Sequence, residues 1–110
     1  MDTFVMPRPT IRWKEELDEG SEFYTAEAIN ASDNLLDEYL SALQAAEDET
    51  AIWKAIEQVV KGFNKLNLQH DCCFIETMER EDLAEYIYKA AEAAGLIYDG
   101  DVTEEWREDW

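Results

Sequence analysis

The sequence predicts a single all-α domain, a small bundle of three main helices plus one or two short helices. Apolar residues recur at intervals of three and four along much of the chain, which is the spacing of one helix face. The 110 residues match the usual size of one domain. With 46% apolar and 12% aromatic residues, the chain also has the means to build a core, which disordered acidic chains lack.

Residues 1–24 are predicted to form an irregular N-terminal segment. Pro7 and Pro9 bias the residues before them toward extended conformations. We expect at most one short helix here, over residues 11–18. The helical domain proper is assigned to residues 25–110, and the whole chain forms one domain.

Two of the main helices follow in the first half of the remaining chain. Thr25 is a predicted N-cap for a helix that runs to about Ala46. Asp48 or Thr50 then caps a second helix. Its apolar residues step by four, three, four and three, which makes it the clearest core helix: Ile52, Ile56, Val59, Phe63 and Leu66. We expect this stripe and Val60 to pack on the apolar faces of the other helices, at Leu36, Leu40, Leu43, Leu83 and Ile87.

The third main helix is predicted to start with Thr77 as its N-cap and to stop at Gly95, where a left-handed backbone carries no side-chain penalty. A turn through Asp99-Gly100-Asp101 follows. Thr103 then looks like the N-cap of a last short helix. Such a helix would place Trp106 and Trp110 on one side, and we expect Trp106 to pack on the domain.

Charge is the feature of this sequence that bears most on function. The chain has 27 acidic and 9 basic residues, which gives a formal charge of −18. Direct binding to nucleic acid or to an anionic membrane needs a basic surface, so both are disfavoured. A cationic protein is the natural complement. The sequence has neither a signal-peptide pattern nor a long apolar run, which predicts a cytoplasmic location.

Two motifs resemble metal sites without meeting their requirements. His70, Cys72 and Cys73 offer three soft ligands, but structural zinc needs four and the cysteines lack the usual spacer between them. Asp99-Gly100-Asp101 is similar to the start of a calcium loop. The later positions of such a loop need a glycine and a glutamate, and here they are Glu104 and Trp110, so a turn is the better interpretation.

Carboxylates at three-residue intervals offer one further metal hypothesis. Glu76, Glu79, Asp82 and Glu85 would lie near one another on a helix, as the magnesium ligands of all-helical nucleotide pyrophosphatases do. Those enzymes need a second acidic pair on another helix, and Glu16 with Glu19 lacks a correctly spaced partner. A solvated helix face is the simpler interpretation. We therefore predict no catalytic residue, no cofactor and no metal ion.

The sequence thus favours a non-catalytic, acidic protein-binding module, of the immunity or inhibitor type, that captures a cationic protein. One alternative is a DNA mimic that occupies a nucleic-acid-binding protein. A carboxylate-metal hydrolase is a weaker alternative. The candidate contacts are two groups of acidic residues that we expect to be exposed: Glu15, Glu16, Asp18, Glu19 and Glu22 near the N-terminus, and Glu104, Glu105, Glu108 and Asp109 near the C-terminus.

The last forty or so residues resemble a family of small acidic bacterial proteins that has no established function. The resemblance is carried by Phe74-Ile75-Glu76-Thr77, by Glu79-Arg80-Glu81-Asp82-Leu83, by Ala90-Ala91 to Ala94-Gly95, and by the ending Asp101-Val102-Thr103-Glu104-Glu105-Trp106-Arg107 with Trp110. It implies a bacterial, cytoplasmic and non-enzymatic protein. It carries over no functional residues.

Overall fold

The computed structural model describes residues 6–20, 24–69, 75–108 and 110. These residues form four helices and no strand: α1 (Pro9–Asp18), α2 (Ala26–Ala45), α3 (Glu49–Gln69) and α4 (Thr77–Ala93). The predicted all-α class is therefore confirmed, with three long helices and one short one.

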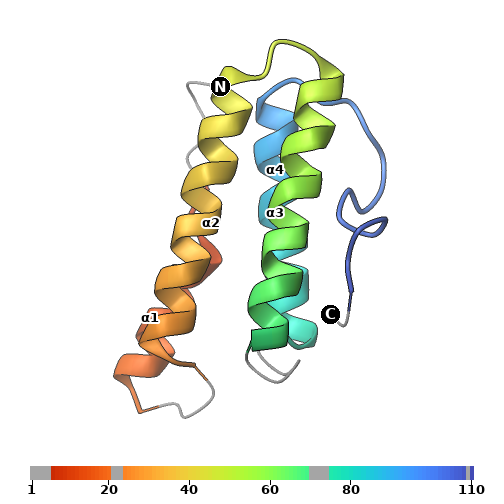
Figure 1. The fold of residues 1–110 in the computed structure, drawn as a ribbon. Coiled ribbons are helices and arrows are strands. Elements are labelled where there is room, and N and C mark those ends of the chain that lie inside the picture. Colours follow the sequence, from red (N-terminus) through yellow and green to blue (C-terminus); the bar gives the residue numbers. More distant parts are fainter. Residues whose placement is uncertain (1–5, 21–23, 70–74, 109) are drawn as a thin grey trace.

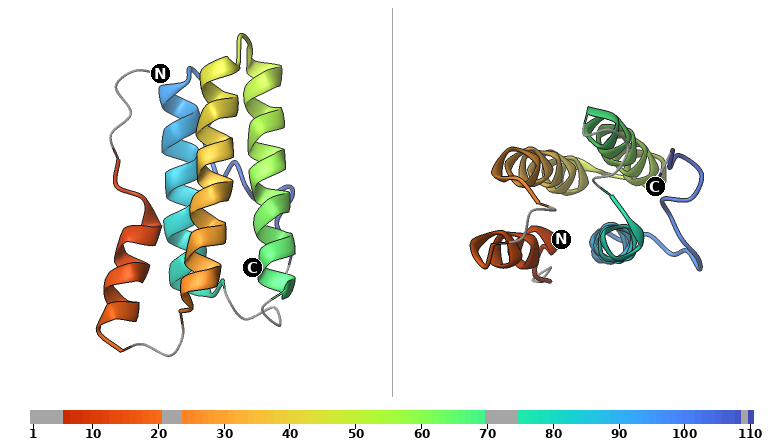
Figure 2. Two further views of the ribbon diagram at one scale, coloured as in Figure 1. Left: turned by 60° about the vertical axis from the view of Figure 1, so that its left-hand side comes forward. Right: turned by 90° about the horizontal axis from the view of Figure 1, so that it is seen from below.

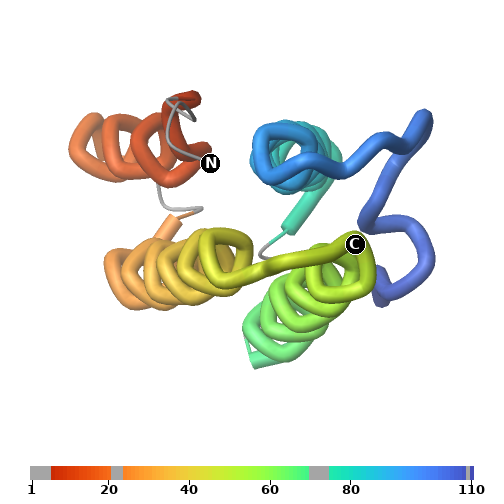
Figure 3. The backbone as a smooth tube through the Cα atoms, turned by 90° about the horizontal axis from the view of Figure 1, so that it is seen from above, coloured from red at the N-terminus to blue at the C-terminus, as the bar shows by residue number. Residues whose placement is uncertain are grey.

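The helices run alternately up and down along the long axis of the molecule (Figure 1). Short connections favour this arrangement, because they join neighbours that must be antiparallel. Seen along that axis, α1 and α4 lie on one side of the bundle, and α2 and α3 lie on the other (Figures 2 and 3). The chain after α4 passes outside the bundle beside α3 and α4, on the side away from α1 (Figure 3).

The core follows the predicted stripe of α3. Ile56, Val60 and Phe63 are completely buried, and Ile52, Val59 and Leu66 nearly so. The faces that pack on them include Leu36, Leu43, Leu83 and Ile87, all buried, while Leu40 is only partly buried at the edge. The periodicity of the sequence therefore placed the core correctly.

The N-terminal segment is more ordered than expected. α1 begins at Pro9, two residues before the expected short helix, because proline fixes a helical φ at a position whose N–H needs no partner. Its Trp13 is completely buried and stacks on Tyr24, with ring centroids 5.9 Å apart. The Thr10 hydroxyl donates to Asp33 Oδ1 of α2 at 2.6 Å. α1 thus packs on the bundle as a helix of its own.

The helix ends confirm most of the predicted caps. Thr25 Oγ1 accepts from the Ala28 N–H at 3.1 Å, and Asp48 Oδ1 accepts from the Ala51 N–H at 2.8 Å. Thr77 is the first residue of α4 and not its N-cap. The cap is Glu76, whose backbone N–H donates to Glu79 Oε1 at 3.2 Å.

The expected last helix is absent from the described C-terminal residues. Thr103 donates both its backbone N–H and its hydroxyl to Asp101 Oδ1, at 2.9 and 2.6 Å, so its side chain does not cap a helix. The chain from residue 102 to 106 forms a succession of turns. A local hydrogen bond from a short polar side chain has replaced helix initiation here.

Candidate partner-binding face

The chain after α4, called here the C-terminal segment (residues 95–108 and 110), is fastened to α3 through one side chain. The Asn64 amide donates to the Trp106 carbonyl at 2.8 Å, and its Oδ1 accepts from the Glu108 N–H at 3.0 Å and from the Trp110 indole N–H at 2.5 Å. Arg107 adds a cross-link inside the segment, because its Nη2 lies 3.0 Å from Asp101 Oδ2. The segment therefore has a defined path across α3.

Aromatic rings complete this attachment. Trp106 lies beside Trp53 of α3 with centroids 6.0 Å apart, and Trp110 lies beside Phe63 at 6.3 Å. The prediction that Trp106 packs on the domain is confirmed, and Trp110 does so too. Trp53 also meets Tyr98 edge to face, with centroids 5.0 Å apart and an interplanar angle of 88°. Such pairs are favourable aromatic geometries.

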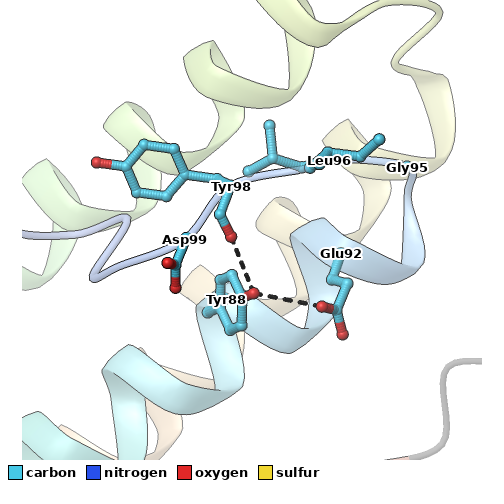
Figure 4. Close-up of a pocket in the computed structure, with 7 residues that line it drawn as sticks. Tyr88, Glu92, Gly95, Leu96, Tyr98 and Asp99 are labelled. Atoms are coloured by element: carbon cyan, nitrogen blue, oxygen red, sulfur yellow. Dashed lines mark hydrogen bonds between the residues drawn. The ribbon is translucent and has the colours of Figure 1, made fainter.

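The start of the segment is held against α4. Gly95 ends the helix with a φ of 114°, as the sequence predicted, and the Leu96 N–H donates back to the Ala91 carbonyl at 3.0 Å. The Tyr88 hydroxyl lies 3.0 Å from the Tyr98 carbonyl oxygen and 3.3 Å from Glu92 Oε2 (Figure 4). Partial burial and the charge of Glu92 raise the pKa of Tyr88, which keeps this donor protonated.

Between these attachments, the segment exposes large apolar side chains. Ile97 is 93% exposed and Tyr98 is 44% exposed, while Leu96 between Gly95 and Ile97 is buried. Gly100 permits this geometry: it has a φ of 133°, and an added Cβ would lie 3.4 Å from the Tyr98 ring. Because both flanks of Ile97 are anchored, its exposure is a fixed feature of the surface.

Two open pockets flank Tyr98. One, of about 660 Å³, lies between the segment and α4 and is lined by Tyr88, Glu92, Gly95, Leu96, Ile97, Tyr98 and Asp99 (Figure 4). The other, of about 210 Å³, lies between the segment and α3 and is lined by Trp53, Tyr98, Asp101, Val102, Glu104 and Glu105. The backbone carbonyl of Tyr98 faces Tyr88, whereas the side-chain ring of Tyr98 points away from Tyr88 (Figure 4).

We define the C-terminal face as Trp53, Tyr88, Ile97 and Tyr98 with the carboxylates of Asp99, Glu104 and Glu105. The three carboxylates are exposed, and none of them lies in an ion pair with a described residue. The face thus has an apolar and aromatic centre with an acidic border. Protein interfaces commonly have this anatomy, with apolar anchors at the centre and a polar rim.

The structure separates the two groups of acids that the sequence singled out. Glu104, Glu105 and Glu108 are exposed on the C-terminal segment. Glu15, Asp18 and Glu19 are exposed on or just after α1, which lies on the opposite side of the bundle (Figure 3). Glu22 and Asp109 lie outside the described residues. The two groups therefore do not form one continuous acidic surface on the same side of the bundle.

Glu16 differs from the other predicted contacts because it belongs to a cluster between α1 and α4. Arg12 lies 3.6 Å from Glu16, 2.6 Å from Asp82 and 3.8 Å from Glu79. Glu79 is buried and accepts from the Tyr24 hydroxyl at 2.8 Å. Partial burial and the nearby Glu79, Glu85 and Glu81 raise the pKa of Asp82 against the opposing effect of Arg12.

This cluster bears on the magnesium hypothesis. It brings carboxylates of α1 and α4 together, as a two-helix metal site would, but the cation at its centre is the guanidinium of Arg12. Across residues 6–20, 24–69, 75–108 and 110, no three histidine, cysteine or acidic side chains gather closely enough to bind a metal ion. His70, Cys72 and Cys73 lie outside the described residues.

Most basic side chains form ion pairs with acidic residues of the same chain. Six form ion pairs with described carboxylates: Arg8, Arg12, Lys14, Lys61, Lys89 and Arg107. The described acids outside such pairs are all exposed, and they are Glu15, Asp18, Glu19, Glu27, Glu38, Glu47, Asp48, Glu49, Glu76, Glu81, Glu85, Asp99, Glu104, Glu105 and Glu108. The net charge of the chain therefore lies on its surface.

Comparison of the chain with protein-family models, with curated proteins and with solved structures finds no match. The resemblance to the family of small acidic bacterial proteins stays a prediction. Among the described residues, no helix has both the length and the apolar content needed to cross a lipid bilayer.

The sequence reasoning missed the apolar half of the face. No motif in the sequence singles out Trp53, Ile97 or Tyr98 as an exposed functional residue. One signal was present: three large apolar residues, Leu96, Ile97 and Tyr98, stand between the helix stop at Gly95 and the turn at Gly100, where no helix periodicity predicts burial.

Proposed function

We propose that this protein is a non-catalytic binding module of the immunity or inhibitor type, and that its C-terminal face captures a cationic protein. The observation that carries the proposal is the side chain of Ile97, 93% exposed on an anchored segment. The exposed carboxylates of the same face, those of Asp99, Glu104 and Glu105, form no ion pair with a described residue. An apolar anchor inside a charged border is the arrangement expected for a specific interface.

The charge of the border complements a basic partner. Asp99, Glu104 and Glu105 belong to a chain whose formal net charge is −18, so the border and the whole chain have the same sign of charge. The field of this negative charge speeds the encounter with a cationic surface and disfavours polyanions. A partner held in this way would have its own basic surface covered, which suits an inhibitor of a protein that acts on an anionic substrate.

The proposal is tested by cross-linking the tagged full-length chain in its native cells and identifying the captured proteins. The informative variant is Ile97→Ala/Glu104→Gln/Glu105→Gln. Its control on the opposite side of the bundle is Ile11→Ala/Glu15→Gln/Glu19→Gln, which loses the same charge and an exposed isoleucine. The proposal is supported if the wild type and the control capture a basic protein that the C-terminal variant does not capture. Equal capture by both variants, or capture of acidic proteins only, contradicts it.

The shape of the molecule favours DNA mimicry as a second candidate. The bundle extends over 42 × 27 × 21 Å, and its charge of −18 along the long axis corresponds to about 0.4 charges per Å, against about 0.6 for duplex DNA. The discriminating experiment is competition. Duplex DNA that displaces the chain from its captured partner favours the mimic, whereas simultaneous binding of DNA and the chain to that partner excludes it.

A further inference from the structure

The smaller pocket of the C-terminal face is lined by two aromatic rings and by carboxylates of which two, Glu104 and Glu105, form no ion pair with a described residue. At about 210 Å³ it is below the roughly 300–1,000 Å³ typical of pockets for whole small molecules, so its size suits one side chain. Trp53 and Tyr98 form two of its walls, at nearly a right angle to each other. Glu104 and Glu105 form its acidic border.

The walls of the pocket are fixed before any partner arrives. The Trp53 indole N–H donates to Glu49 Oε1 at 3.3 Å, and its ring is packed between Tyr98 and Trp106. The third acid of the pocket, Asp101, is already bound to Arg107 and Thr103. The carboxylates left for a partner are therefore those of Glu104 and Glu105.

We propose that this pocket binds an arginine side chain of the cationic partner, with the guanidinium against the rings of Trp53 and Tyr98 and paired to Glu104 or Glu105. A planar guanidinium both stacks on aromatic faces and binds carboxylates through two N–H groups, whereas an ammonium is a compact and strongly hydrated charge. The same segment already holds a guanidinium in this way. Arg107 lies 5.8 Å from the Trp110 ring centroid and 3.0 Å from Asp101.

This inference rests on the proposed function for the existence of a partner, but its test needs none. The full-length chain, labelled with ¹⁵N, is titrated with N-acetyl-arginine methylamide and followed at the tryptophan indole N–H signals. The signal that disappears in Trp53→Phe identifies Trp53. The matched probe is N-acetyl-citrulline methylamide, which has nearly the same shape without the charge, and N-acetyl-lysine methylamide tests the choice of cation.

We expect the arginine probe to shift the Trp53 signal in a saturable way and the citrulline probe to leave it in place. Glu104→Gln/Glu105→Gln should weaken binding by roughly threefold or more, the scale of exposed cation–π and ion-pair contacts. The equally charged control Glu15→Gln/Glu19→Gln should bind like the wild type. Equal shifts with citrulline, tighter binding of the lysine probe, or equal weakening in both double variants would overturn the assignment.

The two proposals fail separately. If the arginine probe does not bind at Trp53 while the C-terminal variant still loses its captured protein, the pocket assignment is wrong and the binding function stands. If the probe binds as expected and no basic protein is captured, the pocket exists and the proposed function is wrong.

Discussion

Asn64, in the second half of α3, donates a hydrogen bond to the backbone carbonyl of Trp106 at 2.8 Å and so ties the C-terminal segment to the bundle. The same side chain accepts from the Glu108 and Trp110 N–H groups. One polar residue thus joins the ring contacts of Trp106 and Trp110 in holding the segment on α3. The position of Glu104 and Glu105 on the C-terminal face depends on this attachment.

Asn64→Ala should therefore destabilise the protein. Each hydrogen bond of this kind contributes about 0.5–1.5 kcal/mol, so the loss of three should lower the free energy of unfolding by about 1.5–4.5 kcal/mol and the melting temperature by several degrees or more. Denaturant unfolding measures the first quantity and calorimetry the second. Asn30→Ala, at an exposed position of α2, is the matched control and should change the free energy by less than about 0.5 kcal/mol. Equal effects at both positions would show that the hydrogen bonds of Asn64 do not stabilise the fold.

The same substitution at two isoleucines tests the core and the face together. Ile56→Ala should cost about 2–5 kcal/mol in unfolding free energy, because Ile56 is 0% exposed and truncation leaves a cavity. Ile97→Ala should leave the stability unchanged within about 0.5 kcal/mol, since Ile97 is 93% exposed. A large loss at Ile97 would mean that its side chain is buried in solution and is not available to a partner.

The attachment of α1 should depend on pH through Asp33. Partial burial favours the neutral acid, but hydrogen bonds from Lys14 and Thr10 and the charges of Lys14 and Arg8 outweigh it, so the pKa of this carboxyl lies below its ordinary value. A carboxylate with a lowered folded pKa contributes stability above its unfolded pKa of about 4, and this contribution is lost as pH falls through the folded value.

Asp33→Asn should consequently be less stable than the wild type by about 1 kcal/mol at pH 6, and the difference should shrink as pH falls toward 3. The difference between the two proteins is the useful quantity, because lowering the pH also relieves repulsion among the other acids. Urea unfolding at several pH values measures it. Glu38→Gln, exposed on the same helix and without an ion pair to a described residue, provides the control. A constant difference between pH 6 and pH 3 would contradict this role for Asp33.

The long helices could be predicted from the sequence because their signals are local and agree with one another. In α3, the apolar stripe and the cap at Asp48 point to the same element, and the stripe is the core. α1 was harder to predict. Its start at Pro9 has a local cause, but the burial of Trp13 involves a contact with Tyr24, and Thr10 bonds to Asp33 on another helix. Tertiary contacts of this kind leave no periodicity to find.

The candidate site could be predicted only in part. The exposure of Glu104 and Glu105 follows from their charge, whereas that of Ile97 contradicts its residue type and emerges from the turns around it. The conformation at Thr103 likewise could not be predicted from the sequence. Its pattern is that of a helix start, and the nearby carboxylate of Asp101 takes the hydrogen bonds instead.

The last prediction concerns the rate at which the captured cationic partner associates with the chain. Exposed carboxylates act mainly through long-range attraction, which salt screens: the Debye length is about 8 Å at 0.15 M and shorter at higher salt. Raising the ionic strength several-fold should reduce the on-rate by about an order of magnitude and change the off-rate much less. Stopped-flow mixing at several salt concentrations measures both rates.

Charge-neutralising variants distinguish the contribution of the carboxylates of the C-terminal face to the on-rate from that of the total charge of the chain. Glu104→Gln/Glu105→Gln/Glu108→Gln should lower the on-rate and weaken its salt dependence. Glu15→Gln/Asp18→Asn/Glu19→Gln removes the same charge on the far side of the bundle and should have a smaller effect, because screening limits attraction to nearby carboxylates. If the on-rate does not change with salt concentration, the acidic residues serve solubility and not association with the partner. Equal effects of the two triple variants would place the attraction in the total charge of the chain and not in its C-terminal face.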